Sequence, residues 1–224
     1  SRGLGDVYKR QGKGRCNLTN LCTPREFLDN VVRNPKFLYS AIYGYTPEDT
    51  VDFFEKNGLK LKTERGNRVF PASDRSVDVV DTMHNYAVES GCKIVCDTAN
   101  SLILEDGAVI GVKCEENTYY ADSVIICCGG KSYPLTGSTG DGYTLAKQAG
   151  HTIVPLKPSL VPFTSNDKQC KDMQGLALKN VALRIVDKNS KKTVYSDFGE
   201  MLFTHFGMSG PMILSASSHL RVIQ

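Results

Sequence analysis

The sequence predicts an α/β domain followed by a β-rich segment, and three observations carry this prediction. An apolar run at Val124–Cys128 ends in the pair Gly129–Gly130, as a buried strand does where it enters a loop. Stretches with helical periodicity and capping residues precede this run. After His151, short strand-like stretches follow one another without helices between them. We therefore expect one domain over residues 12–150 and a second over residues 151–224.

Composition and charge limit the class of protein. The chain has 224 residues, of which 41% are hydrophobic, so it can bury a core. Its net charge of +3 is too mild to argue for nucleic acid or a membrane surface, and no apolar run is long enough to span a bilayer. We expect a cytoplasmic protein that acts on a small molecule, with no nucleic-acid or membrane partner; its oligomeric state stays open.

The cysteines and histidines do not suggest a metal centre. The chain has eight cysteines without a regular framework and no Cys-x-x-Cys pair, which favours reduced thiols. The four histidines are scattered. We therefore predict no metal site.

The chain begins with a stretch that has no periodicity, residues 1–11, which we interpret as a non-native leader; a genuine short N-terminus is the alternative. The loop Gly12–Asn20 follows. Its glycines allow unusual backbone angles, and Arg15 supplies a fork of hydrogen-bond donors. Such a loop suits a diphosphate or the polar edge of a flavin, although alone it would more simply be a turn with an exposed arginine.

Helices and strands alternate over the next hundred residues. We predict helices over 24–33, 47–57 and from Ser73 or Asp74 to Ser90, where Ser73 or Asp74 is the cap. Strand-like alternation at 59–62 precedes a turn at 65–67. Residues 92–128 are predicted as strands, with a meander inserted at 99–121 and a turn at 105–107, before the strand at 123–128 returns to the main sheet.

A second glycine cluster, Ser138–Gly142, precedes a helix predicted to open at Tyr143. The first turn of a helix presents unpaired N–H groups and partial positive charge, which suits a phosphate. Asp141 would repel a phosphate and is better placed to bind a sugar or ribityl hydroxyl. The simpler alternative is an N-capped helix with an acid in its first turn.

The end of the chain carries a further polar string, Phe203–Pro211. We predict strands at 151–155, 181–186, 192–196 and 200–203 around it. His205 in this string either lies near a substrate or belongs to a strand-to-helix turn.

These strings resemble one family. The segment Val124–Gly142 is similar to that of FAD-dependent reductases of the fumarate reductase kind. It more closely resembles bacterial NAD(P)/FAD-dependent oxidoreductases, the family of aminoacetone oxidase-like and dehydro-bile-acid reductase flavoproteins. The loop Gly12–Asn20 is similar to the family's Gly-Gly-Gly-Arg-Cys-Asn-x-Thr-Asn, with Lys13 replacing a glycine. Residues 67–73 are similar to Gly-Arg-Val-Phe-Pro-x-Ser, and Phe203–Pro211 to Phe-Thr-His-x-Gly-x-Ser-Gly-Pro.

The resemblance implies a Rossmann-like FAD-binding domain with an inserted β-meander, followed by the start of a barrel-like second domain. The first strand–helix–strand, with its Gly-x-Gly-x-x-Gly fingerprint, is not recognisable before Gly12, so we expect the FAD domain to be incomplete. FAD is the implied cofactor and NAD(P)H a candidate electron donor. The implied cofactor-binding residues are Gly12, Gly14, Arg15, Cys16, Asn17, Thr19, Asn20, Gly129, Gly130, Ser132, Thr139, Gly140, Asp141 and Gly142.

The implied reaction is flavin-mediated hydride transfer to or from a small organic substrate, with enone reduction as one form. Tyr133 and His205 are candidates for the proton donor. One alternative is a flavin disulfide reductase that uses Cys16 and Cys22; another is a non-catalytic fragment. We expect the chain alone not to retain FAD, and we expect Ile125 and Ile126 to be exposed.

Overall fold

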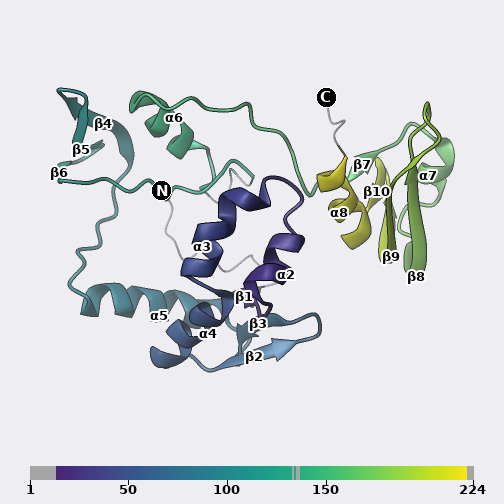
Figure 1. Cartoon of the computed structure of the whole chain (residues 1–224), viewed down its shortest axis with the longest axis horizontal. Helices are drawn as coiled ribbons and strands as arrows, with labels where there is room; N and C mark the ends of the chain where they lie inside the picture. The colour runs from purple at the N-terminus through teal and green to yellow at the C-terminus, as the bar shows by residue number, and fades with distance from the viewer. Residues whose placement is uncertain (1–13, 133, 135–136, 221–224) are drawn as a thin grey trace. The chain divides into compact units, whose positions relative to one another are not determined.

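The computed structural model describes residues 14–132, 134 and 137–220 (Figure 1). The chain divides into two compact units, residues 1–154 and 155–224. Within the described ranges, no helix has both the length and the apolar character needed to cross a membrane.

The first unit contains a three-stranded antiparallel sheet in the order β1-β3-β2. Its strands are β1 (Thr19–Asn20), β2 (Leu61–Glu64) and β3 (Arg68–Pro71). The helices around it are α2 (Pro24–Asp29), η2 (Pro35–Leu38), α3 (Tyr39–Gly44), α4 (Pro47–Lys56) and α5 (Ser76–Glu89). The predicted turn at 65–67 is confirmed, since Glu64 pairs with Arg68.

Local sequence explains where these helices start. Both α2 and α4 begin at capping boxes, in which a threonine and the acid three residues later satisfy each other's backbone N–H groups. Helix α2 ends at Asp29 rather than at the predicted Arg33. The cap predicted for α5 is also wrong: Arg75 occupies the N-cap position and makes no side-chain cap bond, because Ser73 and Asp74 are used elsewhere.

The core of this sheet is small and comes from four elements. Cys16, Phe54, Leu59 and Val79 are buried together, and Leu18, Phe53 and Leu61 pack against them. Phe54 belongs to α4 and Val79 to α5. This cluster therefore joins the loop before β1, two helices and the start of β2.

The predicted meander is confirmed. Strands β4 (Ala99–Glu105), β5 (Ala108–Cys114) and β6 (Thr118–Tyr120) form an antiparallel sheet in that order. At one end of this sheet, the Asp97 carboxylate accepts hydrogen bonds from the backbone N–H groups of Thr98, Glu116 and Asn117. These bonds join the start of β4 to the β5–β6 turn. Helix α6 (Asp141–Gln148) is tied to the meander, because the backbone N–H of Leu102 donates to Gln148 Oε1 at 2.9 Å.

Two predicted strands on either side of the meander are wrong. Residues 92–98 and 123–128 are not in strands, and no parallel sheet occurs among the described residues. A strand exists only where a neighbour satisfies its backbone groups, and the described residues offer none here. The expected exposure is confirmed: Ile125 is 86% and Ile126 is 37% exposed.

The second unit is a four-stranded antiparallel sheet in the order β7-β10-β9-β8. Its strands are β7 (Phe163–Thr164), β8 (Ala177–Val186), β9 (Thr193–Thr204) and β10 (Gly207–Ser209), with helices α7 (Lys168–Asp172) and α8 (Pro211–His219). The two predicted strands at 192–196 and 200–203 are one continuous strand, β9. The predicted strand at 151–155 is absent. Met212 and Ile213 of α8 pack on Met201 of β9 as the core.

Truncating Ile213 should destabilise the second unit. Its side chain is 1% exposed in the α8–sheet core, so Ile213→Ala removes buried apolar surface and leaves a cavity. We expect a loss of about 2–5 kcal/mol in the free energy of unfolding, measured by urea denaturation. Phe198→Ala is the control, because Phe198 is 67% exposed; an equal loss there would contradict the assigned core.

Candidate functional site

The pairing of β1 with β3 brings two sequence signatures together. Thr19 lies opposite Val69, and Asn20 lies opposite Arg68. The loop that ends at Asn20 therefore lies on the strand that carries Arg68–Pro71. Gly12 lies outside the described residues.

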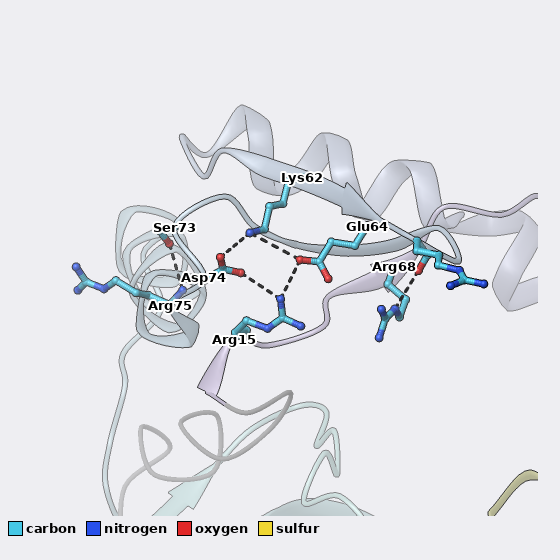
Figure 2. A network of polar contacts seen from close by, with 8 residues as sticks. Arg15, Lys62, Glu64, Arg68, Ser73, Asp74 and Arg75 are labelled. Carbon is cyan, nitrogen blue, oxygen red and sulfur yellow. Dashed lines mark hydrogen bonds and ion pairs between the residues drawn. The ribbon is translucent and has the colours of Figure 1, made fainter. Parts of the chain in front are cut away.

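Arg15 is held by a four-charge network (Figure 2). Its Nη1 donates to Glu64 Oε1 at 2.8 Å and to Asp74 Oδ1 at 3.4 Å. Lys62 Nζ lies 2.5 Å from Asp74 Oδ2 and 3.7 Å from Glu64 Oε1. The Arg15 guanidinium also lies over the Phe70 ring, 4.3 Å from its centroid. Two cations and two carboxylates thus balance, and Arg15 is committed to the sheet.

The other signature side chains are also engaged by the protein, although Asn17 and Asn20 are exposed. Cys16 has a left-handed φ of 60° and is buried in the core. The Asn17 amide, with its nitrogen facing the carbonyls, donates to Val69 O at 3.1 Å, and Asn20 Nδ2 donates to Gly66 O at 2.7 Å. These contacts fix the shape of the loop, so the backbone of the loop is the part best placed to meet a ligand.

The two cysteines of this region are free thiols. Burial raises the pKa of the Cys16 thiol. Burial, together with the nearby Glu26 charge, raises the pKa of Cys22. Because the thiolate is the nucleophile in disulfide exchange, both environments oppose the chemistry of a disulfide reductase.

The second candidate segment is lined by glycines. Gly129, Gly137 and Gly140 have φ values of 73°, 94° and 91°, which favour glycine. A Cβ on Gly140 would lie 3.3 Å from Lys131 Cδ, and one on Gly142 would lie 3.3 Å from Ile126 Cγ2. The glycines therefore let residues 126–131 approach the first turn of α6 closely.

Asp141 is the first residue of α6, two residues before the predicted start. The Thr139 hydroxyl donates to Asp141 Oδ2 at 2.6 Å and orients the carboxylate. Gly130 is half-buried and Ser132 is exposed. The segment thus combines an open helix start with one oriented acceptor, which fits the phosphate and hydroxyl groups of a nucleotide cofactor.

The proton-donor candidates are not placed in a site. Tyr133 lies outside the described residues. His205 is exposed in the turn between β9 and β10, with its ring edge-on to Phe206 at 4.9 Å. The glycines of this string are needed by the backbone: a Cβ on Gly207 would run into Phe163 O, and one on Gly210 would lie 2.8 Å from Met201 Cα.

Sequence reasoning missed the roles of Glu64 and Asp74, the partners of Arg15, and of Lys62, which pairs with the same two carboxylates. The alternation at 59–62 indicated which side of β2 faces the core, but it did not indicate which charges meet across the sheet. Over the described part of the chain, no hydrogen bond or ion pair joins the loop Gly14–Asn20 to the segment Gly129–Gly142. Those same residues include no group of three or more side chains suited to a metal ion.

Comparison with known proteins identifies a family. The family model described as HI0933-like protein Rossmann domain matches residues 2–216. A 3-dehydro-bile acid delta(4,6)-reductase of Clostridium scindens is 27% identical over 97% of this chain and 52% of its own length. A ribosomal RNA dihydrouridine synthase of Escherichia coli is 30% identical over 93% of this chain and 50% of its own.

A D-amino-acid oxidase of Bradyrhizobium diazoefficiens is 29% identical over 38% of this chain. The chain spans about half the length of the reductase and the synthase. Together these matches support a flavin-binding domain of an oxidoreductase, without specifying the reaction.

The Arg15 network should make the free energy of unfolding depend on pH. The Lys62 hydrogen bond, helped by the Lys62 and Arg15 charges, lowers the pKa of Asp74. Because the pKa of Asp74 is lower in the folded state, its ionised carboxylate stabilises the fold at pH values above the ordinary carboxyl pKa of about 3.9. This stabilisation is lost as the pH falls through the pKa of the folded state. We expect Asp74→Asn to flatten the fall in urea midpoint between about pH 5 and 3.

The matched control is Asp122→Asn, because the carboxylate of Asp122 makes no ion pair with any residue that the structure describes. If the urea midpoint of Asp74→Asn falls as steeply with pH as that of the unmodified protein, the ion pairs assigned to Asp74 do not contribute to stability.

Proposed function

We propose, from the premise that the chain belongs to the HI0933-like protein Rossmann family, that it forms part of the FAD site of an oxidoreductase. The observation that carries this proposal is the glycine-lined start of α6, where Thr139 orients Asp141. The backbone of Gly129, Gly130 and Gly140 would hold phosphate, and Asp141 would accept a hydrogen bond from a ribose or ribityl hydroxyl.

The first loop would meet the cofactor through its backbone, because Arg15, Asn17 and Asn20 are occupied by the sheet. When bound, FAD supplies the hydride chemistry. The task of these residues is to bind and orient it. NAD(P)H is the electron donor that we propose.

The names of the two longer matches suggest the substrate chemistry. A delta(4,6)-reductase acting on a 3-dehydro steroid and a dihydrouridine synthase both add hydrogen across a carbon–carbon double bond conjugated to a carbonyl. We infer the same class of acceptor here, and the first candidate is a small organic enone. The second candidate is the uridine ring in RNA, which the 30% identity to the synthase favours.

A direct assay separates these two substrates. The protein, kept in excess FAD and reduced by NADPH under nitrogen, is offered a 3-oxo-4,6-diene steroid or a uridine oligonucleotide, and mass spectrometry records the addition of two hydrogen atoms. Oxidation of NADPH without hydrogenation of either acceptor would count against enone reduction.

Asp141→Ala should weaken flavin binding. Loss of a hydrogen bond to a charged group costs roughly 1.5–3 kcal/mol, or about ten- to a hundredfold in affinity. The measurement is quenching of flavin fluorescence as the protein is titrated with FAD, which detects binding too weak to survive purification. Asp122→Ala serves as the control. Equal FAD affinities for the unmodified protein and Asp141→Ala would contradict the role of Asp141 in binding the cofactor.

The disulfide alternative is tested at Cys22. We expect Cys22→Ser to leave NADPH-dependent turnover within about twofold, because the surroundings of the thiol raise its pKa. Turnover is measured in excess FAD, and FAD binding, read from the quenching of flavin fluorescence, is the control. A loss of two decades in turnover with unchanged flavin would favour a disulfide reductase.

A further inference from the structure

The positive charge of this chain is concentrated on the small sheet β1-β3-β2. Six cationic side chains lie on or beside this sheet, against three carboxylates. The cations are Arg15, Lys60, Lys62, Arg65, Arg68 and Arg75, and the carboxylates are Glu64, Asp74 and Asp78. This region therefore carries three more cations than anions, which equals the net charge of +3 of the whole chain. The mild net charge is thus concentrated in one region.

Within this region the carboxylates are already engaged. Glu64 and Asp74 bind Arg15 and Lys62 in the network described above. Arg75 lies 3.5 Å from Asp78 in the first turn of α5. The inner part of the region is thus electrically balanced, and its cations are not available to a partner without breaking existing pairs.

Arg65 and Arg68 at the β2–β3 turn differ from these residues. Both are exposed, and neither makes an ion pair within the part of the chain that the structure describes. Arg68 Nε donates to the backbone carbonyl of Arg65 at 3.1 Å, which keeps the two residues together. Figure 2 shows Arg68 on the far side of Glu64 from Asp74. Its guanidinium lies 5.8 Å from the centroid of the Phe70 ring, over which Arg15 also lies.

The chemistry of this turn indicates the kind of partner. Guanidinium groups match phosphate oxygens in a planar, bidentate geometry. The turn, Arg65–Gly66–Asn67, has no apolar side chain to insert into a membrane, and interfacial binding to lipid depends on such side chains. A phosphate chain is therefore a better match than a lipid surface.

We propose that Arg65 and Arg68 bind the phosphate backbone of single-stranded RNA. This rests on the second candidate of the proposed function, the uridine ring, because a ring that is to be reduced must be unstacked and hence unpaired. Arg68 lies opposite Asn20 in the β1–β3 ladder. RNA held at the turn is thereby placed next to the end of the loop Gly14–Asn20.

The experiment measures binding of a fluorescein-labelled 12-nucleotide oligouridylate by anisotropy over a series of salt concentrations. Arg65→Gln/Arg68→Gln removes two charges while keeping polar side chains. At low salt we expect about two- to thirtyfold weaker binding, from two lost surface ion contacts. The slope of log affinity against log salt should become shallower by about 1.4, at about 0.7 for each phosphate contact on a single strand.

The matched control is Lys191→Gln/Lys192→Gln. It removes the same charge from the β8–β9 turn of the second unit, and it should change neither affinity nor slope by as much. An equal effect of the control would mean that RNA responds only to total charge and would overturn the proposal. So would tighter binding to phosphatidylserine vesicles than to RNA, or no binding of RNA by the unmodified protein.

Titration with FAD separates this proposal from the flavin assignment. Arg65→Gln/Arg68→Gln should bind FAD as the unmodified protein does, with an unchanged far-ultraviolet circular dichroism spectrum. Weaker flavin binding with the same loss of RNA binding would instead place the turn in the cofactor site and overturn the RNA assignment.

Discussion

The pairing of β1 with β3 is the contact on which the first unit depends, because it fixes a glycine loop that has little structure of its own. The ladder is only two residues long, so other contacts must hold it. Cys16 anchors the loop in the core, and Arg15 anchors it to Glu64 and Asp74 across the sheet. These anchors lie on neighbouring residues, and together they leave the loop little freedom to change shape.

This arrangement explains why a polar signature can be structural. A loop that meets an anionic cofactor through backbone N–H groups must present them in one conformation before binding, since ordering the loop on binding would cost conformational entropy. Cys16 occupies a left-handed conformation that costs free energy in a non-glycine residue. Burial of its side chain, and the Asn17 and Asn20 hydrogen bonds, offset that cost.

The features predictable from sequence are those set by neighbours in the chain. The caps at Thr23 and Thr46, the turn after Glu105 and the glycine end of α5 all depend on residues within a few positions. The strand predicted at 123–128 depends on a partner strand far away in sequence, so an apolar pattern alone could not decide it. The same holds for the Arg15 network, whose partners lie 49 and 59 residues away. Asp74 shows the limit of prediction from local sequence. Its position suggested a helix cap, yet its side chain instead binds Lys62, which is distant in sequence.

Charge has to be judged at the scale of the contacts it makes. Opposite charges within a few ångströms neutralise each other for any partner beyond the screening length of about 8–10 Å, so Arg15 and Lys62 count for little outside their network. Arg65 lies in the β2–β3 turn, and Arg68 begins β3 opposite Glu64, yet neither makes an ion pair with a residue that the structure describes. Whole-chain net charge averages such regions with the acidic faces of α4 and α5 and therefore reports solubility rather than partner. Separating the neutralised cations from the unpaired ones needs the side-chain contacts, because the partners of Arg15 and Lys62 are set by the pairing of β2 with β3 and not by their neighbours in the chain.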